Sequence, residues 1–196
     1  EALIAGLDRT RFQPWVAFYP SGGRLVSTAD YLSRIVTHLQ HRHDFEEMAV
    51  VAHSMGGLVS RGFILRHHAE TGDDLVKVFV SISTPWAGVP SAATGVRRSP
   101  FVVPSWRDVK PKSEFIAELF FEDPEERTIP RPLPDPVAYY LIFGVEDKTV
   151  PVPSQVRWEA ARDARERWPL VYDHTAILES PEASQLLNEI LDREFR

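Results

Sequence analysis

The ten residues VVAHSMGGLV, at positions 50–59, decide the fold of this chain. A run of apolar residues ends at His53, a serine follows, and two glycines open a segment whose apolar residues have helical spacing. This pattern predicts a strand, a sharp turn and a helix, with Ser54 at the corner. Ala52 and Gly56 are small, as expected where the backbones of strand and helix pass close together. Ser54 is then either a nucleophile raised above the end of a strand or only the N-cap of the helix.

Strands and helices are predicted to alternate along the rest of the chain. The predicted strands span residues 15–19, 48–52, 77–82, 138–143 and 170–172. The predicted helices span residues 57–68, 113–121 and 155–168, with one more after the N-caps Ser27 and Thr28, one capped by Ser180, and the tail of another at residues 1–7. Because the strands are apolar on both faces, they belong to a mostly parallel sheet flanked by helices. The fold class is therefore α/β.

A proline-rich region interrupts this alternation. Of the 16 prolines, 12 fall between Pro85 and Pro153. A segment this long with one short predicted helix is expected to be a lid or a binding element. We therefore expect a single domain over residues 1–196, with a lid-like insertion at about residues 86–136.

Composition limits the kind of partner that the protein can have. The chain has 196 residues, enough for one domain with a sizeable core. A net charge of −6 argues against nucleic-acid binding, and the lack of cysteine excludes disulfides and thiolate metal sites. No apolar run of about 18 residues is present, so we expect no transmembrane segment. No signal peptide is visible, which favours the cytoplasm, and no pattern indicates an oligomeric state.

The AHSMGG motif at residues 52–57, directly after two valines, resembles the nucleophile elbow of lipases and esterases of the α/β-hydrolase superfamily. Alanine replaces the first glycine of the usual motif, which resembles the variant of some bacterial lipases. The segment STPWAG at residues 83–88 resembles the TP-x-x-G segment of lipases of the GPI inositol-deacylase-like group. This resemblance implies an α/β-hydrolase fold, hydrolysis of carboxylic esters and no cofactor.

The resemblance also implies an acid and a base, in that order, after the serine. Asp147 lies in a G-x-x-D-x-x-V-P setting after the predicted strand at 138–143, and Glu146 is the alternative acid. His174 follows the predicted strand at 170–172 and is the only histidine after His68. The backbone N–H of Met55, at the start of the helix, is expected to donate to an oxyanion.

Two parts of the expected site are less well defined. A second oxyanion donor usually follows an earlier strand of the fold, and no such strand is predicted before Trp15. We therefore expect the amino-terminal strands of the fold to be missing from these residues. Trp86, Phe101 and Trp106 either line an acyl pocket for the substrate or form a satellite core under the insertion.

The other histidines have structural interpretations. His53 is expected to pack under the elbow. His67 and His68 close a helix, where a positive charge favours the helix dipole. No metal site is predicted, because the three histidines between residues 38 and 43 have no well-placed carboxylate or cysteine to complete one.

Together these residues predict a serine hydrolase that cleaves a lipid or another apolar acyl ester, without a cofactor. Ser54 attacks the ester, His174 transfers the proton, and Asp147 orients His174. Two alternatives remain open. One is a non-catalytic domain of the same fold that binds a lipid or a protein partner. The other is an acyltransferase that uses the same triad and passes the acyl group to an alcohol or a thiol.

Overall fold

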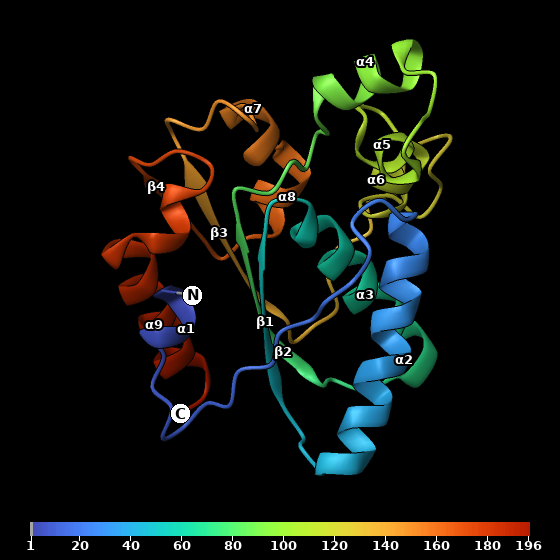
Figure 1. The fold of residues 1–196 in the computed structure, drawn as a ribbon. Coiled ribbons are helices and arrows are strands. Elements are labelled where there is room, and N and C mark those ends of the chain that lie inside the picture. Colours follow the sequence, from blue (N-terminus) through green and yellow to red (C-terminus); the bar gives the residue numbers. More distant parts are fainter. Residues whose placement is uncertain (1) are drawn as a thin grey trace.

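A four-stranded parallel sheet forms the centre of the protein in a computed structural model that describes residues 2–196 (Figure 1). The strands are β1 (Met48–His53), β2 (Val76–Ile82), β3 (Ala138–Gly144) and β4 (Glu166–Leu170), in the order β1-β2-β3-β4. The α-helices are α1 (Ala2–Ala5), α2 (Leu25–His43), α3 (Met55–Thr71), α4 (Pro90–Arg98), α5 (Pro104–Val109), α6 (Glu114–Glu118), α7 (Val152–Gln155), α8 (Trp158–Asp163) and α9 (Pro181–Glu194), and a 3₁₀ helix, η1, spans Ala176–Glu179. None of the helices in this described range is long and apolar enough to cross a membrane. The sheet and its helices confirm the predicted α/β fold class.

The strand ends meet at one edge of the sheet. β1 ends at His53, which pairs with Ile82 at the end of β2. β3 ends at Gly144, which pairs with Leu170 at the end of β4. Because all four strands are parallel, the loops that follow them lie close together at their carboxyl ends. The three residues predicted to form the site, Ser54, Asp147 and His174, lie in the loops at this edge.

Helices cover both faces of the sheet (Figure 1). On the side of α2 and α3, Leu58, Phe63 and Phe79 belong to one buried cluster. On the side of α1 and α9, Val80 and Ile190 belong to a second cluster. Neighbouring residues of β2 alternate between the two clusters, as side chains on a strand must. Nearly all of β2 and β3 is therefore buried, which explains their continuous apolar sequence.

The starts of two helices depend on different signals. Ser180 caps α9 as predicted, because its side chain accepts a backbone N–H of the first turn at 3.1 Å. α2 starts at Leu25, before the predicted caps Ser27 and Thr28. The N–H of Leu25 donates instead to the Asp108 carboxylate at 2.7 Å. This acceptor belongs to α5, so the start of α2 is fixed by a residue far along the chain.

The predicted strand at residues 15–19 is wrong. These residues form irregular chain, in which Phe18 is 87% exposed and Trp15 is 44% exposed. The Trp15 ring makes edge contacts with His43 and Phe45. An apolar run predicted a strand, but a strand also needs a partner for its backbone hydrogen bonds. Within residues 2–196, the sheet offers β1 no neighbour other than β2.

The single predicted helix at residues 155–168 is also wrong. The region contains the end of α7, all of α8 and most of β4, which starts before the predicted strand at 170–172. β4 is an edge strand of the described sheet, and its Trp168 and Leu170 pack on the cluster beside α9. Pro169 lies between them, as an edge strand permits. The many charged residues of this region obscured the period-two pattern of the strand.

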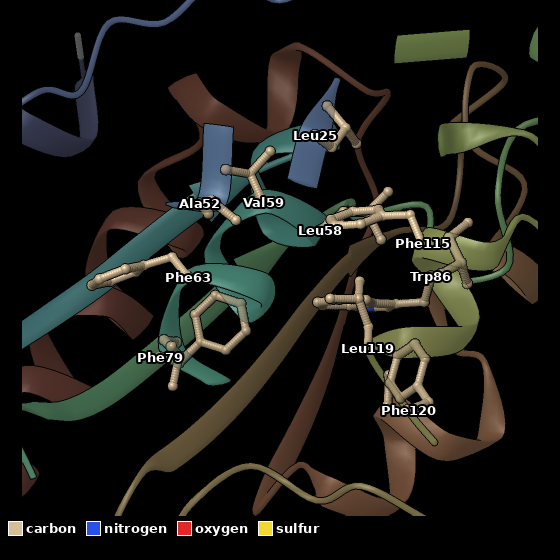
Figure 2. Packing of buried hydrophobic residues seen from close by; sticks show 14 of the residues in the cluster. Leu25, Ala52, Leu58, Val59, Phe63, Phe79, Trp86, Phe115, Leu119 and Phe120 are labelled. Carbon is tan, nitrogen blue, oxygen red and sulfur yellow. The ribbon is translucent and has the colours of Figure 1, made fainter. Parts of the chain in front are cut away.

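The insertion at residues 86–136 contains three helices, α4, α5 and α6, where one was predicted. The part around α6 is largely buried. Phe115, Leu119 and Phe120 belong to the same cluster as Leu58 of α3 (Figure 2). That the insertion acts as a lid stays a prediction.

Candidate active site

Ser54 lies between the end of β1 and the start of α3. Its backbone has φ 54° and ψ −132°, and a positive φ is strained for a residue that carries a side chain. The N–H of Ser54 donates to the carbonyl of Ile82 at 2.8 Å, and its carbonyl accepts from Gly57 at 3.0 Å. Its side chain makes no capping hydrogen bond to α3. The interpretation of Ser54 as a helix cap is therefore wrong.

The two glycines after this corner have different roles. A Cβ atom at Gly57 would lie 2.0 Å from Oγ1 and 2.8 Å from Cβ of Thr84, so a larger residue requires Thr84 to move. A Cβ atom at Gly56 would lie 3.6 Å from the Tyr19 hydroxyl and 3.8 Å from Cβ of Ala52, which is ordinary contact. We predicted the close approach at Gly56, but the structure places it one residue later, where α3 passes the end of β2.

The imidazole of His174 bridges Ser54 and Asp147. His174 lies in the loop between β4 and η1. Its Nε2 is 2.9 Å from Oγ of Ser54, and its Nδ1 is 2.6 Å from Oδ2 of Asp147. Because an ionised carboxylate only accepts hydrogen bonds, Nδ1 carries a proton and Nε2 is free to accept one from the serine hydroxyl. The fold thus brings together three residues from three separate loops.

Asp147, rather than the alternative Glu146, faces His174. The Asp147 side chain is 0% exposed. Its Oδ1 accepts the backbone N–H groups of Thr149 and Val150, both at 2.8 Å. These bonds hold the carboxylate in one orientation, with Oδ2 directed at His174. Glu146 is exposed.

No signal in the sequence pointed to Gln155, which organises the loop that carries the acid. Gln155 is 1% exposed. Its amide nitrogen donates to Oδ2 of Asp147 at 3.3 Å and to the carbonyls of Gly144 and Val150 at 3.1 and 2.8 Å. Its amide oxygen accepts the N–H of Gly144 at 3.1 Å. One side chain therefore ties the end of β3, the following turn and the Asp147 carboxylate together.

Comparisons with known proteins find similarity in sequence and in fold. Residues 25–97, less than half of the chain, match the family model described as lecithin:cholesterol acyltransferase. No curated protein matches the chain. Lipase B of Aspergillus fumigatus superposes with a TM-score of 0.63 at 20% identity, over 89% of this chain and 43% of the lipase. The product of the Listeria innocua gene lin2722 superposes with a TM-score of 0.60 at 16% identity, over 87% of this chain and 68% of that chain.

A third similar structure is described as an α/β hydrolase. It is MGS-MChE2, an α/β hydrolase from a sediment metagenome of the Mar Chica lagoon, Morocco, with a TM-score of 0.50 at 14% identity over 86% of this chain and 71% of that one. This chain is an α/β-hydrolase-fold protein. The fold agrees with the resemblance of the AHSMGG motif, while the more specific resemblance to GPI inositol-deacylase-like lipases stays a prediction. The hydrolase-fold chain spans less than half the length of lipase B and about two thirds of the Listeria protein.

The three aromatic residues predicted at the substrate site of this hydrolase-fold protein differ in their surroundings. Trp86 is fully buried, and its ring centroid lies 5.7–6.3 Å from those of Phe79, Phe120 and Tyr139. Figure 2 shows Trp86 among the buried residues of this cluster. Since no ligand can reach a fully buried ring, Trp86 is a core residue rather than part of a pocket lining. A role for the other two aromatic residues in acyl binding stays a prediction, because Phe101 is 84% exposed between α4 and α5, and Trp106 packs against Gly95.

A polar depression of about 660 Å³ lies beside His174. Charged and hydroxyl side chains line it, namely those of Glu146, Lys148, Thr149, Asp173 and Thr175. Asp173 itself is engaged elsewhere, because its carboxylate accepts the N–H groups of Ala176 and Thr175 at 2.8 and 2.9 Å, and these bonds lower the pKa of Asp173. The Asp173 carboxylate is therefore bonded to the backbone of its own loop.

The remaining histidines of the hydrolase-fold chain are held by local contacts. His67 lies 3.3 Å from the Ser33 hydroxyl and 3.2 Å from the Asp73 carboxylate. His53 was expected to pack under the elbow and instead lies against the ring of His174. In the part of the chain that the structure describes, no group of three or more histidine, aspartate or glutamate side chains is placed to hold a metal ion.

Proposed function

We propose that this protein is a serine hydrolase of carboxylic esters, in which Ser54 is the nucleophile and His174 the general base. Asp147 orients His174. One observation carries the proposal: the His174 imidazole lies within hydrogen-bonding distance of the serine hydroxyl, at 2.9 Å, and of the carboxylate, at 2.6 Å. This is the arrangement that acyl transfer by a serine requires. The similarity in fold to lipase B and the partial match to the acyltransferase family support an apolar acyl ester as the substrate.

The reaction follows from the order of donors and acceptors. The Ser54 oxygen attacks the carbonyl carbon of the ester while Nε2 of His174 takes the hydroxyl proton. The bond to the alcohol then breaks, and the departing alcohol takes that proton from His174, which leaves an acyl ester on Ser54. Water attacks this ester and gives a proton to His174, and Ser54 regains the proton as the carboxylic acid leaves. Asp147 keeps the proton of His174 on Nδ1 in every step.

The oxygen of the attacked carbonyl becomes negative and needs hydrogen-bond donors. We assign the Met55 N–H to this role, because Met55 is the first residue of α3 and an N–H in the first turn has no partner within the helix. Such a donor contributes on the order of 100-fold or more to turnover in serine hydrolases. A second donor is not assigned to a residue of this chain.

Labelling with a fluorophosphonate tests the proposal without a known substrate. The wild-type chain should gain one phosphonyl group on the peptide that contains Ser54, as measured by intact mass and peptide mapping. Ser54→Ala and His174→Ala should abolish labelling. Ser91→Ala, at an exposed serine in α4, should leave it unchanged. Labelling that persists in Ser54→Ala would remove this mechanism.

Acyl transfer is the second candidate, because the family that matches residues 25–97 is an acyltransferase family. The acyl ester on Ser54 would be the same, and an alcohol would replace water in the second half of the reaction. Product analysis with an ester and an added alcohol separates the two functions: hydrolysis yields free acid, and transfer yields a new ester. Ester binding without labelling or turnover would instead indicate a non-catalytic binding domain.

A further inference from the structure

His53 makes two contacts with His174. Its Nε2 lies 2.7 Å from the backbone carbonyl oxygen of His174. The two rings also touch, with their centroids 4.6 Å apart and their planes at 45°. We propose that His53 is a positioning residue: by donating to the backbone of His174, it holds the imidazole of His174 between Ser54 and Asp147. This inference rests on the proposed function of these three residues.

The loop that carries His174 needs such an anchor. β4 ends at Leu170 and η1 begins at Ala176, so His174 belongs to neither element. The bonds to Ser54 and Asp147 involve only the imidazole of His174. A side chain held at its tip still moves if its backbone moves, and a displacement of about 1 Å at a reacting group can cost 100-fold in rate.

His53 supplies the anchor from a rigid part of the fold. It is the last residue of β1 and pairs with Ile82 of β2 in the sheet. It is also directly next to Ser54 in the sequence. One hydrogen bond therefore fixes the backbone of the base relative to the strand end that carries the nucleophile. This link to the sheet adds to the bonds that Asp173 makes within the loop to the N–H groups of Thr175 and Ala176.

The neutral state of His53 is compatible with a positioning role. Burial lowers the pKa of His53, and the neighbouring His174 acts in the same direction, while the hydrogen bond to the His174 carbonyl and the Asp147 carboxylate oppose the shift. His53 is therefore neutral near neutral pH, and its proton must be on Nε2 to donate to the carbonyl. No second positive charge then faces His174 when it takes the proton of Ser54.

Two substitutions separate the hydrogen bond from the ring contact. His53→Gln keeps an N–H donor near the position of Nε2 but removes the ring, whereas His53→Phe keeps a ring and removes the donor. We expect the rate of fluorophosphonate labelling at Ser54 to stay within about 2-fold in His53→Gln. It should fall roughly 5- to 10-fold in His53→Phe, the effect of one neutral hydrogen bond. Thermal unfolding of each variant establishes that it is folded.

Proton NMR gives a readout that does not depend on activity. The His174 Nδ1 proton bound to Asp147 should give a far-downfield resonance that is sharp in the wild type and in His53→Gln, and broadened or absent in folded His53→Phe. Rescue by glutamine is not expected if His53 only fills space. Equal labelling and an unchanged resonance in His53→Phe would overturn the inference, and so would a His53→Gln variant as slow as His53→Phe. If the wild type shows the resonance but is not labelled, the proposed function fails while the resonance still tests the role of His53.

Discussion

At the scale of single residues, neighbouring carboxylates have different roles because of their environments. Asp147 and Glu146 are adjacent in the turn after β3, but only Asp147 points inward and accepts two backbone N–H groups and the His174 imidazole. Glu146 faces the polar depression in the surface. Spacing along the chain could not separate the two with certainty, because either residue follows the strand closely enough to reach a histidine.

The pair offers a matched test of the proposed orienting role. Asp147→Asn removes the negative charge that fixes the Nδ1 proton of His174, and the rate of labelling at Ser54 should fall roughly 10³- to 10⁴-fold. Glu146→Gln makes the same chemical change one residue away and should stay within about 2-fold. Rates are measured as the second-order constants for fluorophosphonate labelling. If the larger loss followed Glu146→Gln, the acid would be assigned to the wrong residue.

At the scale of secondary-structure elements, the contact between α3 and the end of β2 determines how the elbow is built. The first turn of α3 passes so close to Thr84 that only a glycine fits at position 57. Position 56 faces ordinary contacts with Tyr19 and Ala52. The two glycines of the motif therefore tolerate substitution differently, although they are adjacent in the same helix turn.

Alanine substitutions at the two positions should have different effects on stability. Gly57→Ala forces Thr84 to move and should lower the free energy of unfolding by about 1 to 3 kcal/mol, the usual cost of overpacking. Gly56→Ala should leave it unchanged or raise it by up to about 1 kcal/mol, because alanine favours helix. Urea denaturation followed by far-UV circular dichroism measures both. Equal losses in the two variants would contradict the position of the close contact.

At the scale of the whole molecule, Arg61 joins three parts of the fold. This residue of α3 is fully buried. Its guanidinium donates to Asp163 in α8 at 2.6 Å and to the carbonyls of Leu119 and Arg131 in the insertion at 2.8 and 2.9 Å. It also lies 4.4 Å over the ring of Phe120. Arg61 thus connects the second half of the insertion to α3 and α8.

Removing this charge should destabilise the whole domain. Arg61→Met removes the buried donor of two carbonyl groups and leaves Asp163 with only the partly exposed Arg162, at 2.9 Å. We therefore expect a loss of about 3 kcal/mol in the free energy of unfolding. Arg66→Met is the control on the same helix. Arg66 is about one third exposed and pairs with Asp30 at 3.2 Å and Glu118 at 3.5 Å, so its loss should cost less than about 1 kcal/mol. Chemical denaturation compares the two variants, and a similar small loss in both would show that Arg61 does not hold the insertion in place.

Local patterns were sufficient for much of this molecule. The turn at Ser54, the strands β1, β2 and β3 and the Ser180 cap of α9 all depend on residues that are neighbours in the sequence. Apolar runs, small residues and capping side chains express these features directly. The resemblance to α/β-hydrolases supplied the chain order from which Asp147, with Glu146 as the alternative, and His174 were predicted as partners of Ser54, and loops that follow parallel strands meet at one edge.

Only the tertiary structure decided which partner each group finds at a distance. Residues 15–19 are not a strand, because no neighbouring backbone pairs with them in the described range. Trp86 is core rather than pocket, and the first N–H of α2 bonds to Asp108, which is 83 residues away in the sequence. Gln155 holds the acid loop and His53 holds the backbone of His174. Each of these outcomes depends on a contact between residues that the sequence separates, and such contacts follow from how the elements pack rather than from the pattern of any one of them.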